Sequence, residues 1–290
     1  MDGAVILGYL GTLGQQLARL FPGAVLWDRE DVDVTDFARL EEKLRQLDPA
    51  PAVVINCIAF NDVDGAEDRR DAALSLNAAY VGRLAGVCNA LNAWLVHYST
   101  NYVFDGMGGE FAEEDQPNPL SAYAKSKRLG EQLALENASR CYVIRTAVLF
   151  GPKGASELSK KSFVDVMLDL SARTDTIRAV ADEVNSVTYA PDLARATKAL
   201  IDSRAATGIY HLTNSGHASW FEFASEIFRL TGRRIRLEPV PSSAFPRKAH
   251  RPARAVLRNT KTAPLRSWQA ALKEYLEDQG LTTPAVTPQP

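Results

Sequence analysis

The segment Ala-Val-Ile-Leu-Gly-Tyr-Leu-Gly-Thr-Leu-Gly, residues 4–14, decides the fold class. Four apolar residues form a strand-like run, and Gly8, Gly11 and Gly14 follow it before a segment of helical period. Glycines let the backbone turn sharply and approach a pyrophosphate closely, while the following helix directs its free N–H groups at the anion. This context predicts a dinucleotide-binding loop. Its contact residues would be Gly8, Gly11, Thr12, Leu13 and Gly14.

The remainder of the first 150 residues alternates apolar strands with amphipathic helices. Strand-like runs occur at 24–27, 52–55, 95–96 and 142–144, and helical patterns at 37–47, 68–92 and 121–137. Uninterrupted apolar strands separated by helices predict an α/β fold, a Rossmann-type doubly wound parallel sheet covered on both faces.

A looser pattern follows residue 150 and predicts a smaller mixed α/β substrate lobe. Helices are expected at 162–171, 191–202, 219–231 and 267–278, and short strands at 176–180 and 208–212. We expect an NAD(P)-binding domain of residues 1–150, with 181–212 returning to it, and a substrate lobe of 151–180 and 213–279. Residues 280–290, rich in proline and threonine, are expected to be a disordered tail.

The composition is that of a soluble globular protein, with 290 residues, 23% charged side chains and a net charge of −2. No basic stretch dominates, which argues against a nucleic-acid partner. The sequence also contains no apolar run long enough to predict a membrane span. A cytoplasmic protein is the expectation, and a homodimer remains open. Cysteines 57, 88 and 141 and the four histidines lack metal-ligand spacing, so no metal site is predicted.

Polar and small residues follow the second and third strands at the edge where the glycine loop lies. Asp28 could accept hydrogen bonds from an adenosine ribose, whereas Arg29 could meet a 2′-phosphate. The pair therefore leaves NADH and NADPH open as cofactors. Asp33 and Val34 could flank the adenine, and the third strand runs into Cys57, Ile58 and Ala59.

Tyr123 and Lys127 form a Y-x-x-x-K pattern inside a helical segment, which places both side chains on one helix face. A phenol has a pKa of about 10, and a neighbouring ammonium lowers it. The tyrosine could then give a proton to a carbonyl oxygen while hydride reaches the carbon. We expect Lys127 to lower the pKa of Tyr123 in this way.

The segment His-Tyr-Ser-Thr-Asn-Tyr-Val-Phe-Asp-Gly, residues 97–106, completes the pattern. Ligands bind outside the carboxyl ends of parallel strands, and Thr100 is expected there. Its hydroxyl could hold the carbonyl that Tyr123 protonates. The glycine loop, the strand-end hydroxyl and Y-x-x-x-K, in this order, resemble the short-chain dehydrogenase/reductase superfamily in its nucleotide-sugar branch.

Residues 97–106 are more closely similar to the H-Y-S-T-D-Y-V-F-D-G signature of dTDP-4-dehydrorhamnose reductases. Further similarities lie at 27–29, 33–36, 63–67, 145–146, 188–194, 210–212 and 251–252. The resemblance implies reduction of a dTDP-4-keto-6-deoxy sugar by NADPH or NADH. It implies Tyr123 as proton donor, Lys127 as ribose ligand and tuner of Tyr123, and Thr100 as carbonyl ligand. Tyr98 would join the cofactor contacts, and Arg251 could meet the nucleotide diphosphate.

The sequence departs from that family where the sugar is expected. Asn101 stands where the family usually has Asp, and Val148 replaces a tryptophan that forms a wall of the sugar pocket. Residues 152–162 include an insertion, and Val187 stands where the family usually has proline. The cofactor half is retained and the sugar half is altered, so the exact substrate stays open.

Two alternatives come from the same scaffold. Nucleotide-sugar epimerases and dehydratases share the glycine loop and Y-x-x-x-K, but dehydratases place an acidic pair where this chain has Asn101 and Tyr102. A non-catalytic, NADP-binding regulatory subunit is the other alternative. The beta subunit of methionine adenosyltransferase also lacks the pocket tryptophan and carries an insertion after it.

Overall fold

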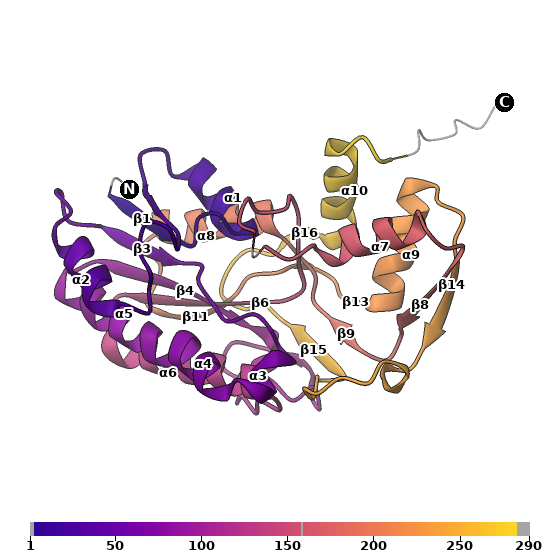
Figure 1. Cartoon of the computed structure of the whole chain (residues 1–290), viewed down its shortest axis with the longest axis horizontal. Coiled ribbons are helices and arrows are strands. Elements are labelled where there is room, and N and C mark those ends of the chain that lie inside the picture. The colour runs from indigo at the N-terminus through magenta and orange to yellow at the C-terminus, as the bar shows by residue number, and fades with distance from the viewer. Residues whose placement is uncertain (1–2, 158, 283–290) are drawn as a thin grey trace.

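The computed structural model describes residues 3–157 and 159–282, which form two lobes joined side by side (Figure 1). The larger lobe contains a six-stranded parallel sheet in the order β2-β1-β3-β4-β6-β11. Its strands are Ala4–Leu7 (β1), Val25–Trp27 (β2), Val53–Asn56 (β3), Trp94–Thr100 (β4), Cys141–Thr146 (β6) and Gly208–His211 (β11). The strand order reverses beside β1, which creates the switch point where such sheets bind ligands.

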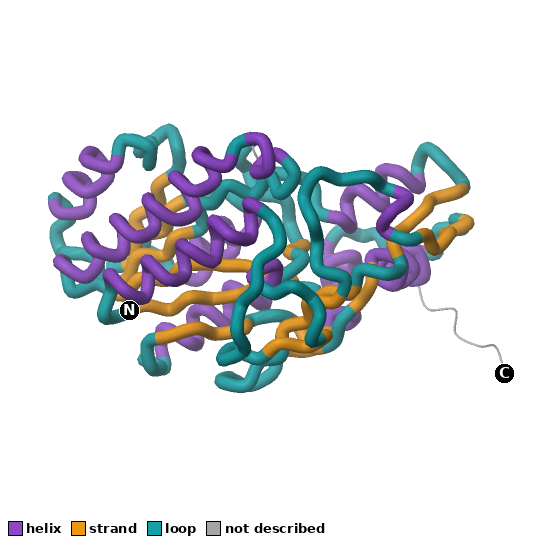
Figure 2. The backbone as a smooth tube through the Cα atoms, turned by 90° about the horizontal axis from the view of Figure 1, so that it is seen from below, coloured by secondary structure: helices purple, strands orange, loops and turns teal. Residues whose placement is uncertain are grey.

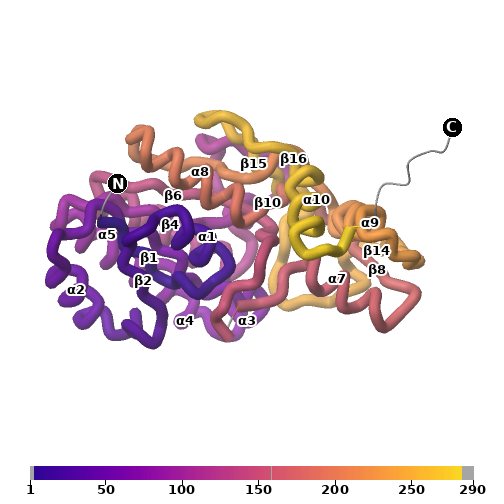
Figure 3. The backbone as a smooth tube through the Cα atoms, turned by 90° about the horizontal axis from the view of Figure 1, so that it is seen from above, coloured from indigo at the N-terminus to yellow at the C-terminus, as the bar shows by residue number. Residues whose placement is uncertain are grey.

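Helices cover both faces of this sheet, because successive side chains of each strand point to opposite faces. Val5 and Leu7 of β1 pack in the core beneath one helical layer, and Ala4 and Ile6 pack beneath the other. The first layer contains Phe37–Arg45 (α2), Tyr80–Ala90 (α5) and Ala122–Asn137 (α6), and the second contains Thr12–Leu20 (α1) and Ala190–Asp202 (α8). Figures 2 and 3 show the two layers from below and from above. The predicted doubly wound sheet is confirmed.

The smaller lobe surrounds a separate aromatic core that includes Phe150, Phe223, Trp268 and Tyr275. Its helices are Phe163–Ser171 (α7), Trp220–Thr231 (α9) and Trp268–Asp278 (α10). Its strands include Thr176–Val180 (β8) paired with Arg236–Val240 (β14), and a four-stranded sheet in the order β13-β9-β15-β5. These four strands are Ala218–Ser219, Val184–Asn185, Arg254–Leu257 and Gly109–Phe111.

Short strands connect the lobes. Leu149–Phe150 (β7) pairs with Thr188–Tyr189 (β10), and Asn214–Ser215 (β12) pairs with Leu265–Ser267 (β16). Strand β5 lies in the smaller lobe's sheet, although we assigned residues 1–150 to the cofactor domain. The reason is that Gly109–Phe111 pair with Ala255–Leu257 rather than with the large sheet.

Helical structure is confirmed over residues 70–90 of the expected 68–92, and it contains a π-helical turn. The structure has Gly65–Asp68 (α3), Arg70–Leu74 (α4), a π-helical turn at Ser75–Ala79, and α5. Of the expected tail, Leu281 packs against the smaller lobe's core, and residues 283–290 lie outside the described residues. No helix within the described ranges has both the length and the apolar character that a membrane crossing requires.

Candidate active site

The glycine loop turns between β1 and α1 in a way that side chains would prevent. Gly8 has a φ of +77°, and a Cβ there would lie 3.0 Å from Cγ1 of Ile58. A Cβ on Gly14 would lie 2.3 Å from the carbonyl oxygen of Gly8. The loop therefore packs tightly under the start of α1, whose first N–H groups have no intrahelical acceptors. This shape suits the pyrophosphate of a dinucleotide.

Asp28 follows the last residue of β2 and is hydrogen-bonded to the glycine loop. Its carboxylate accepts hydrogen bonds from the backbone N–H of Leu10 at 3.0 Å and of Arg29 at 2.8 Å. Arg29 is exposed beside it. Asp33 accepts from the backbone N–H and hydroxyl of Thr35, and these bonds lower the pKa of the Asp33 carboxyl. The proposed adenosine contacts thus gather around one strand end.

The third strand completes this edge. Cys57 donates its backbone N–H to Leu7, and the carbonyl carbon of Cys57 lies 3.4 Å from the position of a Cβ on Gly8. Burial raises the pKa of the Cys57 thiol, which disfavours a reactive thiolate. Val34 packs at the margin of the core beneath α2. Tyr98 directs its hydroxyl to Thr197 of α8 at 2.8 Å.

Tyr123 and Thr100 meet at the carboxyl end of β4. Ser121 caps α6 by accepting from Ala124 N–H at 3.2 Å, so Tyr123 lies in the first turn of the helix. Its ring is only 8% exposed, and its hydroxyl is hydrogen-bonded to the Thr100 side chain. Burial raises the pKa of Tyr123 to about 12, against the opposing effect of the Thr100 hydrogen bond. Two hydroxyls therefore converge on one point at the sheet edge.

Lys127 lies one turn further along α6 and is 2% exposed. Its Nζ donates to the carbonyl oxygen of Tyr98 at 2.6 Å and lies 3.5 Å from Nε2 of His97. Burial lowers the pKa of Lys127 to about 8, although Glu131 opposes the shift. The expectation that Lys127 lowers the pKa of Tyr123 is wrong in this structure, because burial of the phenol dominates and the lysine is directed at β4.

Several residues that anchor α6, the helix that carries Tyr123 and Lys127, could not be identified from the sequence. Asn77, in the π-helical turn, donates to Ser126 Oγ at 2.9 Å and exchanges hydrogen bonds with the backbone of Phe60. Glu67 accepts from the N–H of Ala122 at 2.7 Å. A polar residue inside an apolar helical pattern was the available signal at Asn77.

Asn101 is 2% exposed and is held by the smaller lobe. Its Nδ2 donates to Oδ1 of Asn185 at 2.8 Å and to the carbonyl oxygen of Ala255 at 2.9 Å. Thr100 Oγ1 lies 3.3 Å from its Oδ1. The amide that we expected to face the sugar thus links β4 to β9 and β15.

Val148 lies between β6 and β7 at the margin of the smaller lobe's core. Its φ is +33°, and this region is costly for a β-branched residue. Its carbonyl oxygen accepts from the N–H of Thr188 at 3.1 Å. The position where the resemblance led us to expect a tryptophan is therefore a strained turn between the lobes.

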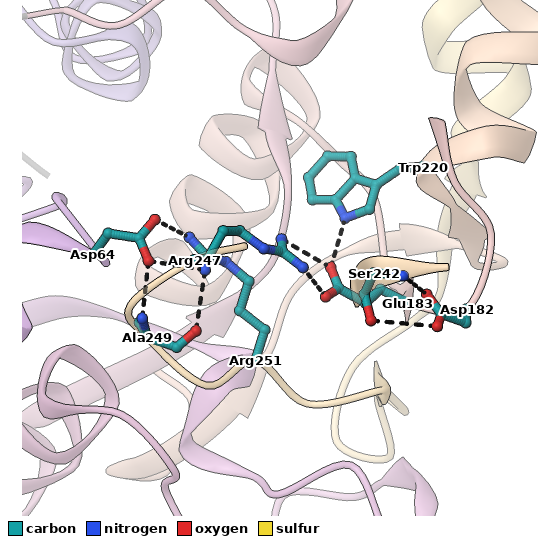
Figure 4. A network of polar contacts seen from close by, with 8 residues as sticks. All are labelled: Asp64, Asp182, Glu183, Trp220, Ser242, Arg247, Ala249 and Arg251. Atoms are coloured by element: carbon teal, nitrogen blue, oxygen red, sulfur yellow. Dashed lines mark hydrogen bonds and ion pairs between the residues drawn. The ribbon is translucent and has the colours of Figure 1, made fainter. Parts of the chain in front are cut away.

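Arg251 and its neighbours form an ionic network across the lobes (Figure 4). Arg251 binds Asp64 with both terminal nitrogens, at 3.1 and 2.7 Å, and lowers the pKa of Asp64 to about 2. The N–H of Ala249 also donates to Asp64. Arg247 pairs with Glu183, which also accepts from Nε1 of Trp220. The guanidinium of Arg251, which we expected to bind the nucleotide diphosphate, is thus bound to the Asp64 carboxylate in this structure.

A family model described as the RmlD substrate binding domain matches residues 3–280. A dTDP-4-dehydrorhamnose reductase of Streptomyces griseus is 37% identical over 93% of this chain and 91% of the relative. A probable dTDP-4,6-dihydroxy-2-methyloxan-3-one 4-ketoreductase of Streptomyces antibioticus is 37% identical over 94% of both. The crystal structure of a Bacillus anthracis dTDP-4-dehydrorhamnose reductase in complex with NADP superimposes with a TM-score of 0.88, at 30% identity, over 96% of this chain and all of that one.

Proposed function

The chain belongs to the RmlD substrate-binding-domain family, and on this premise we propose that it reduces the 4-keto group of a dTDP-4-keto-6-deoxy sugar. It is an NAD(P)H-dependent oxidoreductase with a Rossmann-type fold. The first candidate substrate is dTDP-4-dehydrorhamnose, with dTDP-L-rhamnose as product. The names of its relatives support a 4-ketoreductase, and the altered residues Asn101 and Val148 leave the particular sugar to experiment.

The cofactor would be held where the glycine loop approaches the first turn of α1. Gly11, Thr12 and Leu13 would hold its pyrophosphate. The backbone N–H groups of Thr12 and Leu13, at the helix start, would donate to it, whereas the N–H of Gly11 donates to Gly8 within the turn. Asp28, Arg29, Asp33 and Val34 would surround the adenosine, with Cys57, Ile58 and Ala59 beneath. When bound, NADPH or NADH supplies a hydride to the keto carbon.

Proton donation is the task of Tyr123. Burial raises the pKa of its phenol to about 12, so the protonated form that an acid needs predominates at neutral pH. Thr100, hydrogen-bonded to that phenol, could hold the same carbonyl oxygen. This convergence of two hydroxyls, at the same edge of the parallel sheet as the glycine loop, is the observation that carries the proposal. Lys127 would bind the nicotinamide ribose from the same helix.

The test is turnover of the purified full-length chain. NADPH or NADH oxidation is followed with dTDP-4-keto-6-deoxyglucose in the presence of a 3,5-epimerase, which generates the L-lyxo ketone. We expect oxidation that depends on the epimerase, and no oxidation with the matched UDP-sugar. If NADPH binds but is never oxidised with any dTDP- or UDP-4-keto sugar, the result would contradict a reductase and favour the non-catalytic, NADP-binding regulatory subunit.

A further inference from the structure

A buried polar chain runs from Lys127 into the core of the larger lobe. His97, on β4, is fully buried, and its Nε2 lies 3.5 Å from Nζ of Lys127. Its Nδ1 lies 3.2 Å from Nδ2 of Asn56 on β3. Tyr80 of α5 donates its hydroxyl to Oδ1 of Asn56 at 3.3 Å. The proposed reaction gives His97, Asn56 and Tyr80 no direct task.

The orientation of the Asn56 amide is fixed by its neighbours. The backbone N–H of Ile58 donates to Oδ1 of Asn56 at 3.1 Å, and the Tyr80 hydroxyl donates to the same oxygen. Since these groups are donors here, the atom facing them is the amide oxygen. The amide nitrogen, which carries only donors, therefore faces His97.

This orientation selects one tautomer of His97. Burial and the nearby Lys127 lower the pKa of His97 well below its usual value, so the ring is neutral. A neutral imidazole has one N–H and one acceptor nitrogen. Nδ1 must accept from Asn56, and the proton therefore resides on Nε2, the nitrogen that faces Lys127.

An N–H that faces an amine nitrogen favours one protonation state of the amine. The ammonium form of Lys127 has three donors and no lone pair, so it cannot accept from Nε2–H. The neutral amine can accept from it and still donate to the carbonyl oxygen of Tyr98, which lies 2.6 Å away.

We propose that His97 is a positioning residue of the reductase site, whose Nε2–H faces Lys127 and favours the neutral amine of that side chain. The role given to Lys127 rests on the proposed function, whereas the contact itself does not. His97 would thereby help to keep both the ammonium and the neutral amine of Lys127 populated at the pH at which the enzyme works. A lysine in that condition can take up or release a proton within the buried site.

The other groups around Lys127 have different effects on its protonation state. Glu131, on the same helix, favours the ammonium, but Arg145 of β6 binds its carboxylate at 2.8 Å through both Nε and Nη2, and Arg128 binds it at 2.9 Å. Tyr123, one turn earlier on α6, is a neutral phenol. From β4, Lys127 meets the ring of His97 and the carbonyl of Tyr98. His97 is therefore the side chain on β4 whose proton placement decides the balance.

Nuclear magnetic resonance of the full-length chain tests the proposal without any substrate. The ¹⁵N shifts of the His97 ring report its tautomer, and the ¹³Cε shift of Lys127, assigned by its loss in Lys127→Arg, reports its titration. We expect the Nε2–H tautomer and a Lys127 midpoint well below the usual value of about 10.4. A Nδ1–H tautomer, even with a low Lys127 midpoint, would assign the shift to burial alone and overturn the proposal.

Two variants sharpen the result. Asn56→Asp is isosteric and offers Nδ1 an acceptor, so the ring proton should move to Nδ1 and the Lys127 midpoint should rise. Tyr80→Phe is the matched control, because it removes a different hydrogen bond to Asn56 and should change neither readout. An Asn56→Asp protein whose tautomer moves while Lys127 titrates as before would contradict the coupling. If that variant does not fold, the wild-type tautomer still decides. Failure of sugar turnover would leave these results unaffected, so the two proposals fail separately.

Discussion

The side-chain amide of Asn101 donates a 2.8 Å hydrogen bond to Oδ1 of Asn185, which joins the end of β4 to the smaller lobe. The residues are 84 positions apart in the chain. A second bond from the same nitrogen reaches the carbonyl oxygen of Ala255. Both acceptors are oxygens, so the position requires a donor. The Asn101 amide therefore ties the chain next to Thr100 to the smaller lobe.

Asn101→Asp should consequently destabilise the protein, even though the resemblance led us to expect Asp at this position. A carboxylate has no N–H to offer Asn185 or Ala255, and leaving buried acceptors unpaired costs about 1–3 kcal/mol. We expect a loss of that size in the free energy of unfolding, measured by urea denaturation at pH 7. Asn101→Ser, a small residue with one donor, serves as comparison and should lose less. An Asp variant as stable as the wild type would show that the interlobe bonds contribute nothing.

Arg29 should decide between the two nicotinamide cofactors. It is exposed next to Asp28, whose carboxylate is already bound to the glycine loop through Leu10. Loss of a charged hydrogen bond to a 2′-phosphate costs about 1.5–3 kcal/mol, or roughly tenfold or more in affinity. Arg29→Ala should raise the Kd for NADPH by that factor and leave the Kd for NADH unchanged, as measured by fluorescence titration. Arg45→Ala, which removes an exposed arginine paired with Glu41, is the control. Equal effects on both cofactors would refute this role.

The contact between Asp64 and Arg251 should make the joint between the lobes sensitive to acid. Arg251 lowers the pKa of Asp64 from its ordinary 3.8 to about 2. A lowered carboxyl pKa stabilises the folded state above the ordinary value, and this contribution disappears as pH falls toward the lowered one. Asp64→Asn should therefore lower the melting temperature at pH 6 but have a shrinking effect between pH 4 and pH 2. A difference independent of pH would mean that the ion pair does not set the pKa.

The large sheet was predictable because its strands are continuous apolar runs, such as Ala4–Leu7, that need no distant information. The helix at Phe163–Ser171 was predictable for a similar reason, since Ser162 and Asp165 form a local capping box. Those residues of the candidate site that lie at the carboxyl ends of predicted strands, such as Asp28 and Thr100, were predictable for the same reason.

What the sequence could not supply were contacts made by segments far apart in the chain. The π-helical turn near Asn77 packs closely on α6, since a Cβ on Gly130 would lie 2.0 Å from the Asn77 carbonyl oxygen. The partners of Asn101 come from β9 and β15, and the partner of Lys127 is a backbone carbonyl of Tyr98. Spacing within one helix put Tyr123 and Lys127 on the same face but gave no account of their burial, which sets both pKa values.

The most direct test of the account compares NADPH oxidation by the wild type, Tyr123→Phe and Tyr142→Phe on the epimerised dTDP-4-keto-6-deoxy sugar. Tyr142 is the matched control, because it is a buried tyrosine whose hydroxyl donates to Ala205 in the larger lobe. General acid catalysis contributes about 10²–10⁴-fold, so Tyr123→Phe should lose that much in kcat with little change in the Kd for NADPH. Tyr142→Phe should turn over as the wild type does. Wild-type turnover by Tyr123→Phe would contradict the central claim that this phenol is the proton donor.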